Sequence, residues 1–247
     1  MPPPLTLVAL HGNGGGAFRF ARVEPFVPAD VRFRPVTLPG FASVPRDPTL
    51  TTLRADAERL REWLLAEPRP RVLLGHGIGG SIALELAQFA SDSMDGLILH
   101  APVGARLGSR LFPRLMALPG ARRLGPWVFS ARLLRPFWRR RLFSRPVPRD
   151  YTDRFFAEYR ACSVFAQMFE LVTPDWFASL RPVPVKAALL WGERERVLTV
   201  GQLDAFRALL PGCFVSLPGR WDHFPMIDEP EAYAREVSAL ARKLAVR

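Results

Sequence analysis

The stretch RVLLGHGIGGSIALELA, residues 71–87, is the part of the sequence that decides the fold. The apolar residues 72–74 are typical of a buried strand, and the glycines that follow indicate a tight turn. A helical pattern of apolar residues at 82–86 begins at once. The stretch therefore predicts a strand, a glycine turn and a helix in direct succession, with Gly77 at the centre of the turn.

Length and composition indicate a single domain with one large core. The chain has 247 residues, of which 49% are hydrophobic. It contains no run of 18 apolar residues and no export signal at its start, so we expect a cytoplasmic protein. Cys162 and Cys213 lie far apart and have neither a disulfide framework nor metal-ligand spacing, which favours two reduced thiols. We expect no metal and no cofactor.

Strand patterns alternate with helical patterns, and a long segment interrupts them. This alternation predicts a mostly parallel sheet with helices on both faces. The expected strands are 5–10, 31–38, 72–74 and 97–99, followed after the interruption by strands within 185–193 and 213–219, and the clearest helices are 51–67 and 230–245. We therefore expect a core made of residues 1–102 and 182–247, with a helical, arginine-rich insertion at 103–181.

The positive charge of the chain is concentrated in that insertion. The net charge is +11, and residues 106–149 contain twelve arginines and no Asp or Glu. No nucleic-acid recognition motif accompanies them, so we expect no nucleic-acid partner. A solvated arginine face, an anionic ligand, an acidic carrier protein and a peripheral contact with an anionic membrane all remain open.

Aromatic residues alternate with these arginines. We expect the aromatic side chains to line the inner side of the insertion and the arginines to face outward. The aromatic residues concerned are Phe112, Trp127, Phe129, Phe137, Trp138 and Phe143.

Four segments resemble the α/β-hydrolase family. They are ALHGNGGGAF (9–18), LLGHGIGGSIALELA (73–87), LLWGERERV (189–197) and GRWDHFPMIDEP (219–230). The resemblance extends from residue 5 to 245 and is weak only across the insertion. It implies the α/β-hydrolase fold: a mostly parallel sheet flanked by helices, with a helical cap insertion and without the first two strands of the full fold.

The resemblance also implies where a catalytic site would lie. It places Gly77 at the nucleophile position of the strand-turn-helix motif, where the family pattern has serine. The backbone N–H groups of Asn13 and Ile78 would form the oxyanion hole. His223 would be the catalytic histidine and Glu195 the acid that orients it, although Glu193 is an alternative.

The chemistry of this site depends on the missing hydroxyl. Glycine adopts a positive φ almost without strain, so the turn should persist and leave a small void beside His223. We do not expect Ser43, Ser81 or Ser163 to replace the nucleophile, because their sequence positions direct them elsewhere. The remaining histidines, His11, His76 and His100, are expected to be structural.

Three functional hypotheses follow. In the first, the chain has the ancestry of an esterase or related small-molecule hydrolase, and Gly77 replaces the serine either naturally or by engineering. In the second, His223 and Glu195 work without a covalent intermediate, by activating water or by moving a substrate proton in an addition, elimination or cofactor-free oxygenation. In the third, the chain binds a ligand without turnover, which is similar to the N-myc downstream-regulated proteins. In each case the expected ligand is a small apolar molecule, with an anionic group left open.

Overall fold

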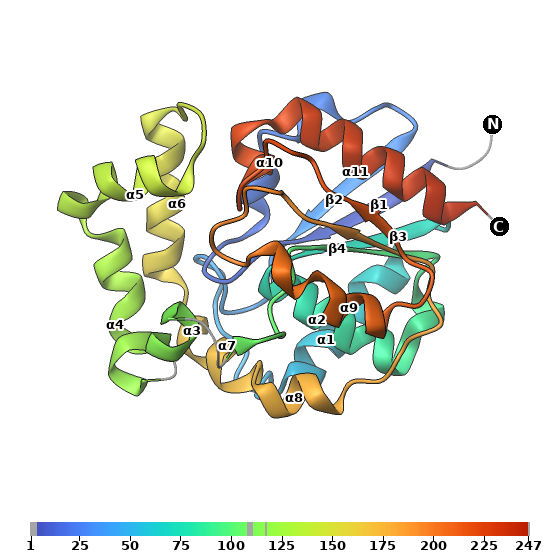
Figure 1. Ribbon diagram of the computed structural model, residues 1–247, viewed down its shortest axis with the longest axis horizontal. Helices are drawn as coiled ribbons and strands as arrows, with labels where there is room; N and C mark the ends of the chain where they lie inside the picture. The colour runs from blue at the N-terminus through green and yellow to red at the C-terminus, as the bar shows by residue number, and fades with distance from the viewer. Residues whose placement is uncertain (1–3, 108–110, 117, 247) are drawn as a thin grey trace.

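The computed structural model describes residues 4–107, 111–116 and 118–246. Its centre is a six-stranded sheet in the order β2-β1-β3-β4-β5-β6, with every neighbouring pair parallel. The strands are β1 (Leu5–Leu10), β2 (Val31–Val36), β3 (Arg71–His76), β4 (Gly96–His100), β5 (Ala187–Leu190) and β6 (Phe214–Ser216). The predicted fold class, a parallel sheet flanked by helices, is confirmed (Figure 1).

The helices of the described chain lie on both faces of this sheet and beside it. They are α1 (Leu53–Ala66), α2 (Ile78–Ala90), α3 (Leu111–Met116), α4 (Pro119–Ser130), α5 (Arg135–Leu142), α6 (Arg149–Ala161), α7 (Phe165–Leu171), α8 (Pro174–Ser179), α9 (Leu203–Leu209), α10 (Pro225–Asp228) and α11 (Pro230–Ala245). In β1, Val8 and Leu10 pack in the core that contains α1 and α2, while Leu7 and Ala9 pack in the core that contains α11. Successive side chains of a strand point to opposite faces of the sheet, so the buried strand β1 contributes apolar residues to both cores.

The order of the strands determines where a ligand can bind. From β1 the chain moves outward to β2, and it then returns to place β3 on the opposite side of β1. The loops that leave the carboxyl ends of β1 and β3 therefore diverge, and such a switch point is where open α/β sheets bind ligands. These two loops are the segment that begins at His11 and the turn at Gly77.

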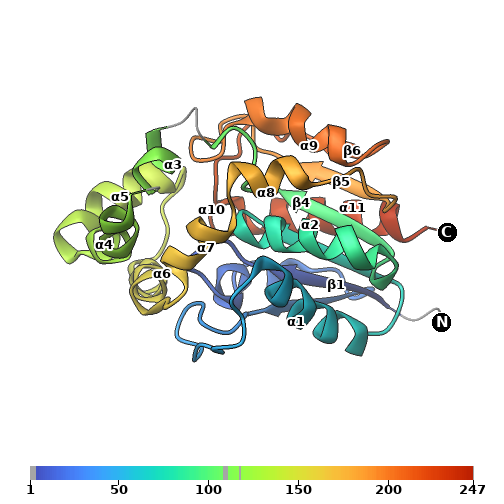
Figure 2. The ribbon, with the colours of Figure 1, turned by 90° about the horizontal axis from the view of Figure 1, so that it is seen from below.

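Between β4 and β5 the described residues form helices and no strand. Helices α3 to α6 stand beside the core at one end of the molecule (Figures 1 and 2). Helix α8 instead packs on the core, because the Trp176 indole donates to Glu85 Oε2 at 2.9 Å and Phe177 contacts Phe206 with ring centroids 5.1 Å apart. The described helices include none that is both long enough and apolar enough to cross a membrane.

Two of the aromatic residues expected on the inner side of the insertion face solvent instead. Trp127 is 53% and Phe137 is 59% exposed. Residues two apart on a helix point to different sides, so Trp127 and Phe129 cannot both face the core. Phe129 contacts Tyr159 with ring centroids 4.6 Å apart, and Phe143 is buried. The side chain of Phe112 lies outside the described part of the chain.

Candidate active site

The turn between β3 and α2 has the geometry that the sequence predicts. Gly77 has φ +56° and ψ −119°, and α2 begins at the next residue. This backbone conformation strains a non-glycine residue by about 1–3 kcal/mol. The glycine therefore holds the turn without strain.

There is nevertheless room for a side chain at Gly77. An added Cβ would meet only Gly12 Cα, at 3.5 Å, which is an ordinary van der Waals contact. At Gly79, by contrast, a Cβ would lie 2.4 Å from the His11 carbonyl oxygen. Crowding thus explains the glycine at 79, where α2 crosses β1, but not the glycine at 77.

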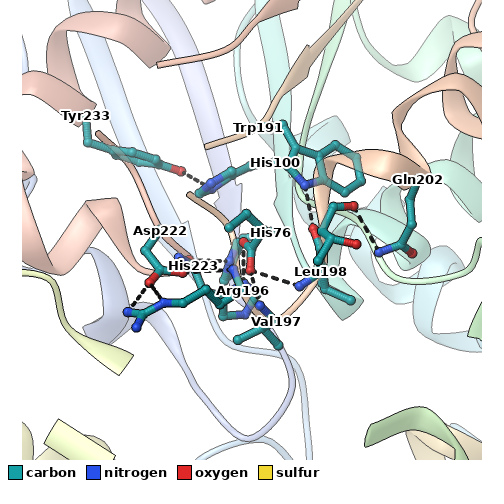
Figure 3. A network of polar contacts seen from close by, with 12 residues as sticks. His76, His100, Trp191, Arg196, Val197, Leu198, Gln202, Asp222, His223 and Tyr233 are labelled. Atoms are coloured by element: carbon teal, nitrogen blue, oxygen red, sulfur yellow. Dashed lines mark hydrogen bonds and ion pairs between the residues drawn. The ribbon is translucent and has the colours of Figure 1, made fainter. Parts of the chain in front are cut away.

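Glu195 and His223 form the hydrogen-bonded pair that the sequence predicts. Glu195 lies after β5 and His223 lies after β6, and the distance from His223 Nδ1 to Glu195 Oε2 is 2.8 Å. Figure 3 shows the network of polar contacts in which His223 lies. The second carboxylate oxygen accepts from the N–H groups of Val197 at 2.6 Å and Leu198 at 2.9 Å. The Glu195 side chain has no exposed surface, so this carboxylate is fixed in position. Neither Glu193 nor Asp222 is the partner of the His223 ring.

The hydrogen bond also assigns the tautomer of His223. An ionised carboxylate can only accept, so Nδ1 carries the proton and donates it to Glu195. The other ring nitrogen, Nε2, is then available as a base. The His223 side chain is 11% exposed, which leaves it close to the boundary between the protein interior and solvent.

His76, the residue before Gly77, holds His223 beside the turn. The His76 Nε2–H donates to the His223 carbonyl oxygen at 3.1 Å, and the two ring centroids are 4.7 Å apart. Burial lowers the pKa of His76 well below its usual value, and the neighbouring His100 and His223 act in the same direction. His76 is therefore neutral and positions the His223 backbone.

His100 continues this row of rings on the side away from His223. Its ring centroid lies 4.7 Å from that of His76, and the Tyr233 hydroxyl is 3.2 Å from its Nδ1. Burial lowers the pKa of His100 to about 3. The structural interpretation of His76 and His100 therefore agrees with their contacts, although the row itself was not visible in the sequence.

Asp222 connects the two loops that carry the pair. Its Oδ1 accepts from the backbone N–H of His223 at 2.9 Å and from that of Arg196 at 3.0 Å, and its Oδ2 binds the Arg196 guanidinium. Neither Asp222 nor Arg196 was assigned a role from the sequence. The sequence did contain a signal for this link. A basic residue, Arg196, directly follows Glu195, and an acidic residue, Asp222, directly precedes His223.

The loop after β1 lies close to the turn, because Gly12 Cα is the atom that a Cβ at Gly77 would meet, at 3.5 Å. The Asn13 amide donates to the Phe165 carbonyl oxygen at 3.1 Å, which ties this loop to α7. Because Ile78 is the first residue of α2, its N–H has no acceptor within the helix and lies at the positive end of the helix dipole. A negative charge that develops near Gly77 would be stabilised there.

Helix α6 covers this region. Arg19, which follows the loop after β1, forms a buried ion pair with Glu158 of α6 at 3.2 Å. The Arg19 guanidinium also stacks over the Phe155 ring at 3.6 Å, and Phe155 contacts Phe224, the neighbour of His223, with centroids 5.2 Å apart. The cover of the site is therefore largely apolar and aromatic.

Two of the three serine hydroxyl groups considered as substitutes are engaged elsewhere. Ser81 donates to the Val103 carbonyl oxygen at 2.7 Å, and Ser163 donates to that of Gly40 at 3.2 Å. Within the described residues, no three His, Cys, Asp or Glu side chains are grouped so that they could hold a metal ion.

Comparisons with known proteins agree on one family. The family model described as the alpha/beta hydrolase family matches residues 7–236. A pimeloyl-[acyl-carrier protein] methyl ester esterase from Aromatoleum aromaticum is 26% identical over 256 residues, which cover 96% of this chain and 98% of that protein. A protein of the same name from Neisseria meningitidis is 23% identical and covers 95% of this chain and 93% of its own.

Solved structures with low sequence identity share the fold. An esterase from Exiguobacterium antarcticum superposes with a TM-score of 0.77 at 16% identity and covers 98% of this chain and 93% of its own. An esterase from Thermogutta terrifontis gives a TM-score of 0.73 at 18% identity, with 98% and 91% covered.

Proposed function

This chain belongs to the alpha/beta hydrolase family, and from its membership and the geometry around Gly77 we propose that it hydrolyses a carboxylic ester without a covalent intermediate. The observation that carries this proposal is the 2.8 Å hydrogen bond between His223 and the buried Glu195, in a site where position 77 has no hydroxyl. A base is oriented there, and water takes the place of the nucleophile.

In this proposal His223 is the general base. Its Nε2 takes a proton from a water molecule as the water oxygen attacks the ester carbonyl carbon. Glu195 holds the ring and stabilises the imidazolium that forms. The tetrahedral intermediate then collapses, its bond to the alkoxide breaks, and the alkoxide takes the proton from His223 as it leaves, so the carboxylic acid and the alcohol are the products.

The backbone N–H groups of Asn13 and Ile78 would hold the oxyanion. Such donors act at the carbonyl oxygen whether the nucleophile is serine or water, and each contributes about 10²–10³ in rate. Gly77 in this scheme is the former nucleophile position and provides space for the attacking water. No metal or cofactor takes part in any step.

We propose residues 1–102 and 182–247 as the catalytic core and 103–181 as a cap over the site. The substrate would be an ester with an apolar acyl chain, because Phe224 lies beside His223 and continues into a row of aromatic rings through Phe155 to Tyr159. The related proteins that are named as methyl ester esterases support the ester as the bond that is cleaved.

The test is hydrolysis of a series of methyl and p-nitrophenyl esters with acyl chains of increasing length. We expect turnover without a burst phase and without labelling by a fluorophosphonate, because no acyl-enzyme forms. His223→Ala should reduce kcat/KM by about 10²–10⁴, the usual contribution of a general base. If no ester in the series is hydrolysed in a His223-dependent way, the proposal is wrong and ligand binding without turnover becomes the better hypothesis.

A further inference from the structure

The outer side of the cap exposes a set of large apolar side chains. Each is more than half exposed, and Leu133 reaches 94%. We call this set the outer cap face: Leu118, Leu124, Trp127, Val128, Leu133 and Phe137. Leu118 directly precedes α4, and the others lie on α4, the short 3-10 helix Arg132–Leu134 and α5, which follow one another with almost no connecting loop.

The spacing of these residues shows that their exposure is systematic. Leu124, Trp127 and Val128 occupy positions i, i+3 and i+4 of α4, the pattern that normally faces a core. Here the opposite side of the helix packs inward, with Pro126 and Ser130 buried. Figures 1 and 2 both place α4 and α5 at the end of the molecule away from the sheet, so the described chain has no further element to cover this side.

Arginines without acidic partners accompany the outer cap face. Arg122 pairs with Glu170 at 3.2 Å, and Arg135 and Arg139 both pair with Asp153. Four other arginines form no ion pair with any described residue: Arg123, Arg132, Arg140 and Arg141. Residues 106–149 contain no Asp or Glu, so no negative charge within this segment offsets them.

We propose that the outer cap face docks on the surface of an anionic lipid membrane. Helices that combine Trp, Phe and Leu with arginine lie in the interfacial region, where the apolar side chains enter the acyl boundary and the cations contact the headgroups. Guanidinium groups match phosphate oxygens in geometry, and the aliphatic stems of arginine allow the charge to remain at the interface. This inference does not depend on the proposed hydrolysis.

The apolar residues favour a membrane over an acidic protein as the partner. Charge complementarity with an acidic protein would account only for the four arginines. It would not account for the outward stripe on α4 or for the nearly complete exposure of Leu133. An anionic membrane explains both the arginines and the exposed apolar side chains, because its headgroups are negatively charged and the acyl chains beneath them are apolar.

The experiment measures binding of the full chain to vesicles of phosphatidylcholine, with and without an equal part of phosphatidylglycerol, by co-sedimentation. We expect binding at least about tenfold tighter to the anionic vesicles, since each arginine near such a surface adds attraction that salt screens. Leu124→Ser/Leu133→Ser/Phe137→Ser should weaken this binding by about tenfold or more. The matched control, Phe26→Ser/Leu65→Ser/Val246→Ser, changes exposed apolar residues outside the cap and should leave binding unchanged.

Entry of side chains into the lipid bilayer is measured separately, by the quenching of tryptophan fluorescence by brominated acyl chains. Trp127 is the one tryptophan of six that is more than half exposed, so quenching should occur in the unmodified chain and disappear in Trp127→Phe. The proposal is overturned if the chain binds both vesicle types equally. It is also overturned if the chain binds the anionic vesicles but the apolar substitutions do not weaken this binding and the brominated acyl chains do not quench the fluorescence. Binding of a purified acyl carrier protein through Arg123, Arg132, Arg140 and Arg141, without binding to vesicles, would identify an acidic protein as the partner instead.

Discussion

Among single residues, Gly77 has the greatest consequence for chemistry. It combines a positive φ of +56° with open space for a Cβ, and it follows directly after the histidine that holds the His223 backbone. In the proposed scheme, a hydroxyl at this position would supply the nucleophile that the arrangement lacks. A Cβ at position 77 fits without displacing a neighbouring atom.

Gly77→Ser is expected to create a covalent catalyst. The serine hydroxyl would lie beside an oriented His223, so labelling by a fluorophosphonate and a burst phase with an activated ester should both appear. The positive φ should lower the free energy of unfolding by about 1–3 kcal/mol. Gly77→Ala is the matched control, because it has the same backbone strain without the hydroxyl. A stable Gly77→Ser variant that stays unlabelled would show that the His223 ring is not within reach of position 77.

At the scale of secondary structure, α1 contains an acid in an unfavourable position. Asp56 lies in the first turn of this helix but is only 2% exposed, and its Oδ2 has no hydrogen-bond partner among the described residues. Burial raises the pKa of Asp56 to about 7. The favourable helix dipole at this end does not offset the loss of hydration.

Asp56→Asn should therefore stabilise the protein at high pH and not at low pH. Between pH 4 and 7 the unfolded chain releases the Asp56 proton while the folded chain keeps it, so stability falls with rising pH in this window and levels off above it. At pH 8 the substitution should raise the free energy of unfolding by up to about 4 kcal/mol, with little effect at pH 4. Urea denaturation at both pH values measures this, with Asp204→Asn, an 88% exposed side chain, as the control. An equal effect at both pH values would contradict the raised pKa.

Across the whole molecule, a buried ion pair connects the proposed catalytic core to the proposed cap. Arg19 is 3% and Glu158 is 9% exposed at the side chain, and they join the loop region after β1 to α6. Removal of one partner leaves a buried charge without compensation, which usually costs about 3–5 kcal/mol. Replacement of both by apolar residues removes that penalty.

We accordingly expect strong coupling between these two positions. Arg19→Met should lower the free energy of unfolding by about 3–5 kcal/mol, and Arg19→Met/Glu158→Leu should cost less than the sum of the two single substitutions. Arg54 and Glu58, which are 49% and 57% exposed, form a matched surface pair whose loss should cost less than about 1 kcal/mol. Additive effects at Arg19 and Glu158 in urea denaturation would show that the buried pair does not hold the cap.

The resemblance to the α/β-hydrolase family predicted Glu195 and His223 as a pair, whereas local patterns by themselves determined the parallel sheet and the glycine turn at 77. The sheet and the turn depend on apolar runs and glycine positions, which carry their signal within a few residues. The sequence also gave the boundaries of α1 and α11 closely, since their amphipathic period is regular. In the segment 103–181, arginine and proline interrupt the apolar periodicity, so the sequence predicted helical structure there but not the bounds of the individual helices.

Only the tertiary structure decided which partner His223 takes, how Asp222 joins the two loops and where Trp127 and Phe137 lie. Each of these depends on segments that are distant in the chain, such as the loops after β5 and β6, whose approach is determined by the sheet order. Burial of a side chain likewise depends on whether another element covers it. A helix pattern specifies two faces, but the packing of the whole chain selects the face that meets the core, and on α4 it leaves the apolar stripe outside.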